Sequence, residues 1–258
     1  MQEIIDFHTH PWGRAEHNIC HYRELMEGDP AAVYYRDLTR CGITRAAGMP
    51  ICRGLEPAEQ MRLSNRDALA LRETLGEFYI PGMAIHPAFV RESCEEMERM
   101  HAAGVRLIGE LVPYCCGWGD DPFLHPGLSE ILALAEELSM VVSFHSMAAR
   151  ADEYEMIKKH PGVTFVGAHP GEKDTYLRHL SWIEERPNYY LDLSGTGLFR
   201  YGMLAYGVRR VGAERLLFGS DYPICSPGMN IGAVEYENIR DGERELILSG
   251  NAKRLLGL

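Results

Sequence analysis

The sequence lacks the long apolar runs and paired cysteine motifs that mark several large classes of protein. No stretch of its 258 residues approaches the roughly 18 consecutive apolar residues that a membrane-spanning helix needs. The first residues show no basic region followed by an apolar one, which is the pattern of a secretion signal. The seven cysteines are scattered and form no CxxC motif, so we expect reduced thiols and no disulfide framework. These absences predict a soluble, cytoplasmic protein without a membrane partner.

Positive charge is also scarce. The chain has 26 Lys and Arg against 37 Asp and Glu, which gives a formal net charge of -11. Proteins dedicated to nucleic acid carry the opposite imbalance, so we expect no nucleic-acid partner. Linkers rich in Ser and Gly, charge blocks and repeats are absent, and 46% apolar residues are ample for a sizeable core. We expect one domain over residues 1–258; whether the chain forms a homo-oligomer is left open.

Short apolar runs alternate along the chain with longer segments of helical spacing. Near-continuous apolar runs such as Val141–Phe144 are typical of parallel strands buried on both faces. Gly42 and Gly212 mark the expected ends of helices near 31–41 and 200–211. The expected strands are residues 3–8, 43–48, 78–85, 105–111, 140–145, 163–168, 189–193 and 215–219.

Eight strand-then-helix units within about 250 residues match the size and order of a (β/α)8 TIM barrel, an α/β fold. The alternative is a doubly wound open sheet, which would require a Gly-rich turn after its first strand. The first strand is instead followed by His8-Thr9-His10, so the barrel is the better prediction. In the third unit, Ser93 and Glu96 form the pattern of a capping box.

Histidines and carboxylates stand where the predicted strands end. In a parallel barrel these ends share one rim, around the mouth where active sites lie. His8 and His10 are two residues apart and therefore point to the same side of their strand. Neutral imidazole and carboxylate are ligands that zinc accepts, and manganese, iron and nickel as well. The predicted ligands of a divalent metal, zinc before the others, are His8, His10, Glu110, His145, His169 and Asp221.

Each member of this set also has a plainer interpretation. A single histidine at a strand end is often a hydrogen-bonded core residue. Asp221 could open a turn or cap the next helix, and Glu110 could pair with a cation or a backbone amide at the rim. Only 11 of the 258 residues are histidine, so four of them at rim positions favour the metal site.

These motifs resemble the amidohydrolase superfamily over the whole chain, with HxH after the first strand, His after the fifth and sixth, and Asp after the eighth. The sequence is most similar to the amidohydrolase-related branch, which includes aminocarboxymuconate semialdehyde decarboxylase. The segments that carry this similarity are Ile5–His10, Ala168–Gly171, Leu217–Pro223 and Asn251–Gly257. Gly109-Glu110 followed by Pro113-Tyr114 is instead similar to TatD-type hydrolases, whose fourth-strand Glu binds metal.

The resemblance implies one of two metal arrangements. With a single ion, the ligands would be His8, His10, His145 and Asp221, and His169 would polarise substrate or water. With two ions, Glu110 would bridge them, and His145 and His169 would bind the second.

The expected function is that of a metal-dependent hydrolase. The metal would lower the pKa of a water molecule, Asp221 would accept its proton, and the metal or His169 would stabilise the oxyanion. The bond cleaved would be an ester, lactone, amide or phosphoester of a small molecule. A metal-dependent, non-oxidative decarboxylase is the alternative, and a non-catalytic metal-binding barrel is a more remote one.

Several loop residues just beyond the strand ends are candidates for substrate contact. The predicted substrate-binding residues are Trp12, Arg150 and Lys173. The connection from about residue 11 to 30 is long for a barrel and is a candidate lid over the mouth. The histidines interpreted as surface residues are His17, His21, His101, His125, His160 and His179.

Overall fold

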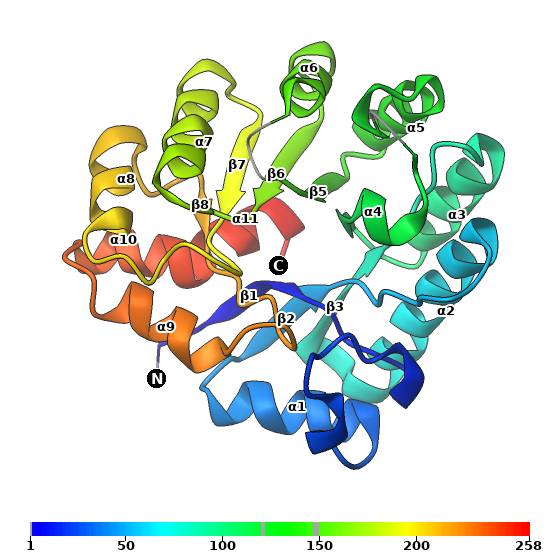
Figure 1. The fold of residues 1–258 in the computed structure, drawn as a ribbon, viewed down its shortest axis with the longest axis horizontal. Coiled ribbons are helices and arrows are strands. Elements are labelled where there is room, and N and C mark those ends of the chain that lie inside the picture. The colour runs from blue at the N-terminus through cyan, green and yellow to red at the C-terminus, as the bar shows by residue number, and fades with distance from the viewer. Residues whose placement is uncertain (1, 120–121, 147–149) are drawn as a thin grey trace.

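Eight parallel strands form one sheet whose order around the barrel is the order along the chain (Figure 1). The structure is a computed structural model and describes residues 2–119, 122–146 and 150–258. The strands are β1 (Ile5–Thr9), β2 (Arg45–Gly48), β3 (Tyr79–Met83), β4 (Leu107–Leu111), β5 (Val141–His145), β6 (Thr164–Ala168), β7 (Tyr189–Asp192) and β8 (Leu216–Leu217). Each lies within one of the predicted apolar runs or overlaps it, so the predicted (β/α)8 barrel is confirmed.

The barrel closes between its first and last strands. The backbone N–H of Phe7 donates to the carbonyl of Phe218 at 2.9 Å, and that of His10 donates to Tyr222 at 2.7 Å. β8 is shorter than the predicted run 215–219 because the N–H of Phe218 turns to the carbonyl of Ile247 at 2.9 Å. The last strand therefore stops pairing with β7 after Leu217, while the chain beyond it continues beside β1 as far as Tyr222, which forms a parallel bridge with Thr9.

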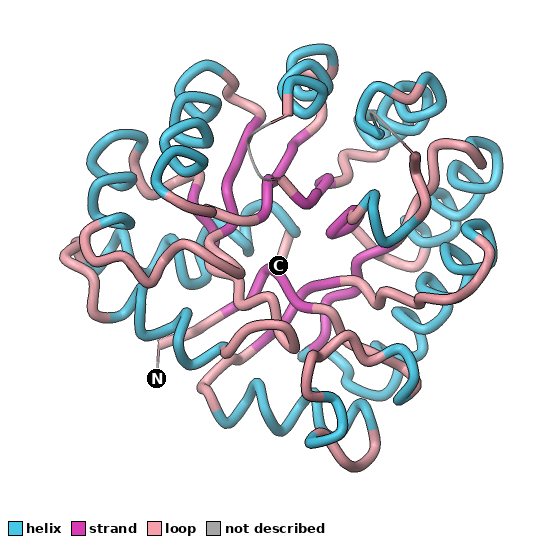
Figure 2. The backbone as a smooth tube through the Cα atoms, viewed as in Figure 1, coloured by secondary structure: helices cyan, strands magenta, loops and turns pink. Residues whose placement is uncertain are grey.

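Helices surround the strands on the outside (Figure 2). The α-helices are α1 (Pro30–Arg40), α2 (Pro57–Leu75), α3 (Val90–Ala102), α4 (Pro113–Cys116), α5 (Pro126–Glu137), α6 (Ala151–Lys159), α7 (Lys173–Glu185), α8 (Met203–Val211), α9 (Pro227–Glu235), α10 (Asp241–Glu245) and α11 (Asn251–Leu256). Short 3-10 turns are η1 (Ala15–His17), η2 (Arg23–Leu25), η3 (Gly76–Phe78) and η4 (Pro122–Leu124), and η5 (Leu246–Gly250) is a π-turn. Within the described ranges, no helix combines the length and apolar character needed to cross a bilayer.

Local sequence explains where several helices begin and end. The side chain of Asp29 accepts a hydrogen bond from Ala32 N at 2.9 Å, which caps the start of α1. Gly42 follows the end of α1 with a φ of 87°, as predicted. The predicted capping box is wrong: α3 begins at Val90, so Ser93 lies inside the helix. Its hydroxyl instead accepts from His86 N and donates to His86 O, at 2.9 and 3.0 Å.

The apolar core has one layer between sheet and helices and another inside the barrel. The interior layer includes Ile5, Phe7, Val141 and Val166, with Ala252 and Leu256 of α11 packed against it. Because α11 closes this end, the carboxyl ends of the strands at the opposite end are left open for the polar side chains.

Two strands carry an irregularity where these polar side chains stand. In β1, Asp6 pairs with Ala46 but Thr9 pairs with Gly48, so β1 has one extra residue. In β4, the pairing with β5 slips in the same way between Ile108 and Leu111. Such bulges bend a strand and redirect its side chains, and they are common beside active sites.

Candidate metal centre

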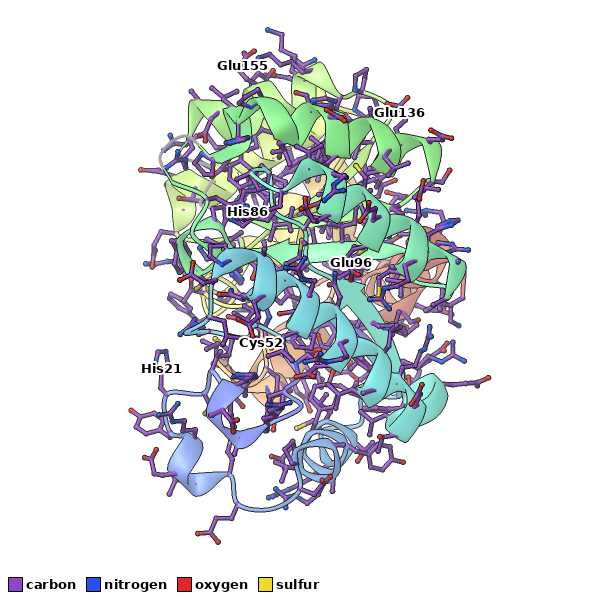
Figure 3. All side chains as sticks on the ribbon, turned by 90° about the vertical axis from the view of Figure 1, so that its right-hand side faces the viewer. His21, Cys52, His86, Glu96, Glu136 and Glu155 are labelled. Atoms are coloured by element: carbon purple, nitrogen blue, oxygen red, sulfur yellow. The ribbon has the colours of Figure 1, made fainter. Side chains whose placement is uncertain are left out.

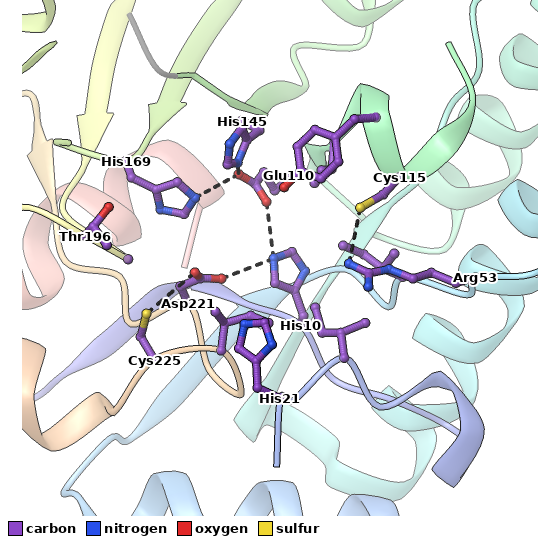
Figure 4. Close-up of a pocket in the computed structure, with 16 residues that line it drawn as sticks. His10, His21, Arg53, Glu110, Cys115, His145, His169, Thr196, Asp221 and Cys225 are labelled. Atoms are coloured by element: carbon purple, nitrogen blue, oxygen red, sulfur yellow. Dashed lines mark hydrogen bonds and ion pairs between the residues drawn. The ribbon is translucent and has the colours of Figure 1, made fainter. Parts of the chain in front are cut away.

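The six predicted ligands come together at the carboxyl end of the barrel, and Figure 4 shows five of them, all but His8. His8 Nε2 and His10 Nε2 lie 3.2 Å apart. Glu110 Oε2 lies 3.4 Å from the first and 3.2 Å from the second. Asp221 Oδ1 lies 3.7 and 3.5 Å from the same two nitrogens. Two imidazoles and two carboxylates therefore surround one point.

The other oxygen of Glu110 faces a second pair of histidines. Glu110 Oε1 lies 3.2 Å from His145 Nδ1 and 3.4 Å from His169 Nε2. The backbone that carries this carboxylate is tightly packed, since Gly109 has a φ of 98° and any Cβ there would lie 2.1 Å from the carbonyl oxygen of Ser143. Only glycine fits at that position, and it places Glu110 between the two pairs of imidazoles.

Three of the histidines use their inner ring nitrogen for a hydrogen bond to the protein. The pairs are His8 Nδ1 with Asp192 Oδ2 at 2.8 Å, His10 Nδ1 with Met49 O at 3.2 Å, and His169 Nδ1 with Ser194 Oγ at 2.8 Å. Such bonds fix the tautomer and orientation of metal-binding histidines and leave Nε2 as the atom that can bind the metal.

The chemistry of this donor set fits a metal ion. Because Asp192 and the Met49 carbonyl can only accept, His8 and His10 must carry their protons on Nδ1 when they are neutral. Their two Nε2 lone pairs then face each other across 3.2 Å, beside an anionic oxygen of Glu110. A cation between them turns this unfavourable arrangement into a favourable one. The potential metal-binding atoms form two groups, and the atoms of each group lie within 4.8 Å of one another. One group is His8, His10 and Asp221, and the other is His8, Glu110 and His169.

The buried carboxylates of the cluster also call for positive charge, which either a protonated His8 or a bound cation supplies. Burial alone would raise the pKa of Glu110, but the charge on His8 and the bonds from the other imidazoles hold it well below its usual range. Burial opposes charge on His8 too, yet Asp192 and Glu110 raise its pKa well above the ordinary value. Asp192 has a lowered pKa, because its interaction with His8 outweighs the cost of burial. The buried carboxylates are thus anionic and demand positive charge beside them.

Asp221 is held by the closing turn of the barrel. Its N–H donates to His8 O at 2.9 Å, and its φ of 63° places it in the left-handed region. Its carbonyl accepts from Ile224 and Cys225, so this aspartate also opens a turn, as the plainer interpretation expected. Its carboxylate nevertheless points to the cluster, 3.5 Å from His10 Nε2.

A cavity of about 370 Å³ opens over the cluster. His10, Glu110, His145, His169 and Asp221 form its floor. Its walls include Ile19 and His21 from the β1–α1 connection, Ile51 and Arg53 from the β2–α2 connection, and Tyr114 and Cys115 from α4. The β1–α1 connection thus lies at the mouth of the barrel, where it was predicted as a lid.

The predicted substrate contacts do not line this cavity. Trp12 is buried at 3% exposure and packs against the rings of Tyr34 and Tyr222. Lys173 is exposed at the start of α7, and Arg150 is bonded to the carboxylate of Asp152 at 2.8 and 2.9 Å. Positions beyond a strand end therefore did not by themselves identify pocket residues.

Other residues at the site were missed or misinterpreted in the sequence. Asp192 ends β7 and could have been found by the strand-end rule that found the histidines. No sequence pattern points to Arg53, because only the path of the β2–α2 connection brings it to the cavity. His21 is exposed, as predicted, but stands at the cavity wall. His179 is fully buried and bonds Tyr189 OH through Nδ1 at 2.6 Å, so its interpretation as a surface residue is wrong.

Comparisons with known proteins agree with the fold. A protein-family description, amidohydrolase, matches residues 5–258. An uncharacterised TIM-barrel protein of Bordetella bronchiseptica is 20% identical, with a TM-score of 0.74 over 99% of this chain and 98% of that one. A 2,6-dihydroxybenzoate decarboxylase of Rhizobium is 16% identical, with a TM-score of 0.73 over 100% and 99%. A candidate 2-pyrone-4,6-dicarboxylic acid hydrolase of Pseudomonas putida is 18% identical, with a TM-score of 0.73 over 100% and 98%. A search of curated proteins found no match.

Proposed function

The chain belongs to the amidohydrolase family, and from that membership we propose that it is a hydrolase with two divalent metal ions, which cleaves an ester, lactone, amide or phosphoester bond of a small molecule. The observation that supports it is the position of Glu110, whose two carboxylate oxygens face two different pairs of histidines. A carboxylate in that position is suited to bridge two ions.

The donor atoms divide into two groups. His8, His10, Asp221 and Glu110 Oε2 would hold one ion, and His145, His169 and Glu110 Oε1 the other. Nitrogen and oxygen donors of this kind suit zinc or manganese. When bound, the metals would lower the pKa of a water molecule and polarise the bond to be cleaved.

Asp221 is the proposed general base. Its carboxylate lines the cavity and is 8% exposed, so it can meet both water and substrate. It would take the proton of the attacking water and pass it to the leaving group. We expect Asp221→Asn to lower kcat about 100-fold or more while circular dichroism shows an intact fold. Near-normal turnover in this variant would contradict the role.

Arg53 brings a guanidinium group to the cavity wall, and we propose that it binds an anionic group of the substrate. A charged hydrogen bond contributes about 1.5–3 kcal/mol, so Arg53→Ala should lower kcat/KM for an acidic substrate about 10- to 100-fold. Mono-p-nitrophenyl succinate and p-nitrophenyl acetate form a matched pair of test esters, because only the first carries a free carboxylate. An equal loss on both esters would contradict the assignment.

The decisive experiment for two ions is metal content per chain, measured by plasma emission spectroscopy on protein purified without chelator or affinity nickel. We expect about two equivalents in this centre, and loss of at least one in Glu110→Gln. Glu172→Gln is the matched control, since Glu172 is exposed and pairs with Arg200. A centre that binds a single ion equally well without the Glu110 carboxylate would refute the bridge.

The second candidate function is a metal-dependent decarboxylase. It is favoured by the similarity to the 2,6-dihydroxybenzoate decarboxylase over the full length of both chains. A single ion in the centre would be consistent with it. Release of carbon dioxide from hydroxybenzoates, with no oxygen from ¹⁸O-labelled water in the aromatic product, distinguishes it from hydrolysis.

A further inference from the structure

A third group of potential ligands lies outside the candidate metal centre. His17, Cys52 and Asp67 each offer one donor atom, and these atoms lie within 4.8 Å of one another. They come from three separate segments: His17 from η1, Cys52 from the β2–α2 connection and Asp67 from α2. The barrel thus brings an imidazole, a thiol and a carboxylate together from positions far apart in the sequence.

We propose that His17, Cys52 and Asp67 bind a zinc ion that fastens the β1–α1 connection to the barrel. Zinc binds sulfur at about 2.3 Å and nitrogen or oxygen at about 2.0–2.2 Å, which places its donors roughly 3–4 Å apart. Cys52 Sγ and Asp67 Oδ2 are 3.9 Å apart. Three protein donors leave the fourth tetrahedral position to water.

His17 supplies an independent observation. Its Nδ1 atom is buried and has no hydrogen-bond partner among the described residues. Buried polar nitrogens are almost always paired, so an unpartnered one on a ring that offers a donor atom to this group calls for a ligand. The backbone before it is packed closely on the site, since a Cβ on Gly13 would lie 2.8 Å from Asp67 Oδ2.

The burial of Cys52 argues against a catalytic role for these three residues. Its side chain is inaccessible to solvent, so no substrate can reach the sulfur. Burial also raises the pKa of the Cys52 thiol to about 11, so without a metal it is a poor nucleophile. Binding of zinc would displace the thiol proton to solvent and leave a thiolate on the ion.

The position of the site gives it a consequence for the cavity. The β1–α1 connection carries Ile19 and His21, and the β2–α2 connection carries Ile51 and Arg53; all four line the cavity. Figure 3 shows His21 and Cys52 on the same side of the molecule, and Figure 4 shows His21 and Arg53 on the walls beside His10. A zinc ion held by the three ligands would join these two walls. This inference goes beyond the proposed function and does not depend on it.

Cobalt is the probe for this site, because a thiolate bound to Co²⁺ gives a charge-transfer band in the near ultraviolet. The donors of the candidate metal centre include no sulfur, so the band reports on the third site alone. We expect the band when Co²⁺ is added to metal-free protein, and its loss in Cys52→Ser and in His17→Ala. The His17 variant keeps the fold testable, because His17 is only partly buried and its replacement leaves the buried Cys52 in place.

Cys225→Ser is the matched control, because Cys225 Sγ lies 3.9 Å from Asp221 Oδ2 and is the thiol beside the metal centre. It should keep the band. Absence of the band in the unaltered protein, its persistence in Cys52→Ser, or its loss in Cys225→Ser would each overturn the proposal. Metal content separates this proposal from the previous one. If both are right, the unaltered protein holds about three ions per chain and His17→Ala about two; a total of only about one zinc in the unaltered protein, retained by Glu110→Gln and lost by His17→Ala, would support the third site and refute the two-ion centre.

Discussion

Asp192→Asn is the sharpest test of how the metal centre is organised. Asp192 is fully buried; its Oδ2 accepts from His8 Nδ1 at 2.8 Å and its Oδ1 accepts from Ser194 N at 2.9 Å. Asparagine keeps one oxygen for Ser194 but presents an amide N–H₂ group to His8. We expect His8 Nδ1, which Ser194 Oγ also faces at 3.0 Å, to accept from this group, and the ring proton to move to Nε2, the atom that faces the metal site.

The expected size of the effect follows from the loss of this support. Removing an outer partner of a metal-binding histidine costs about 10- to 100-fold in metal affinity, or about 1.4 to 2.7 kcal/mol. Activity should fall to a similar degree at limiting metal and recover in part when zinc is in excess, because the remaining ligands are unchanged.

The assay is calorimetric titration of zinc into metal-free protein. Asp6→Asn is the matched control, since Asp6 is also fully buried and accepts from the backbone N–H of His8 at 3.2 Å but does not contact its ring. The control should bind zinc like the unaltered protein. Unchanged affinity in Asp192→Asn, or an equal loss in both variants, would refute the reasoning.

Two further predictions concern residues around the site. Gly195 has a φ of 67°, and a Cβ there would lie 2.4 Å from His169 Nδ1; Gly195→Ala should therefore displace His169 and lower the metal content, measured by plasma emission. Burial lowers the pKa of His86, although its bond to the Cys116 carbonyl opposes this, and Ala88 N donates to its unprotonated Nδ1. Neutral His86 therefore contributes to the free energy of unfolding above pH about 6.5. This contribution is lost as the pH falls, by at most about 1.4 kcal/mol per pH unit. The free energy of unfolding, measured in urea from pH 7 to 5, should depend less on pH in His86→Asn than in the unaltered protein. Parallel curves for the two proteins would contradict this prediction.

The strand-end argument succeeded because it rests on backbone geometry. In a parallel barrel every strand ends at the same rim, so His145 and His169 at the ends of neighbouring strands had to meet. The same rule identified Glu110 and Asp221 and would have identified Asp192. β8 is shorter than predicted, because the N–H of Phe218 donates to Ile247 in η5, although its carbonyl still accepts from Phe7 of β1.

The loop residues could not be predicted in the same way. Trp12 follows β1 by a few residues, as a pocket residue would, but it turns into the aromatic cluster with Tyr34 and Tyr222. Arg53 lies beyond β2 and turns into the cavity. A loop side chain's direction depends on contacts with other segments, and these are not encoded in its own spacing.

The sequence by itself therefore determined the barrel, its family and the residue types around its mouth, because apolar periodicity and strand-end chemistry are local properties. Only the tertiary structure decided that Glu110 lies between two pairs of histidines, through a bulge in β4 and a glycine that tolerates close contact. It alone brought His17, Cys52 and Asp67 within reach of one ion. Both arrangements depend on distances between segments far apart in the chain, and those distances are fixed only when the core packs.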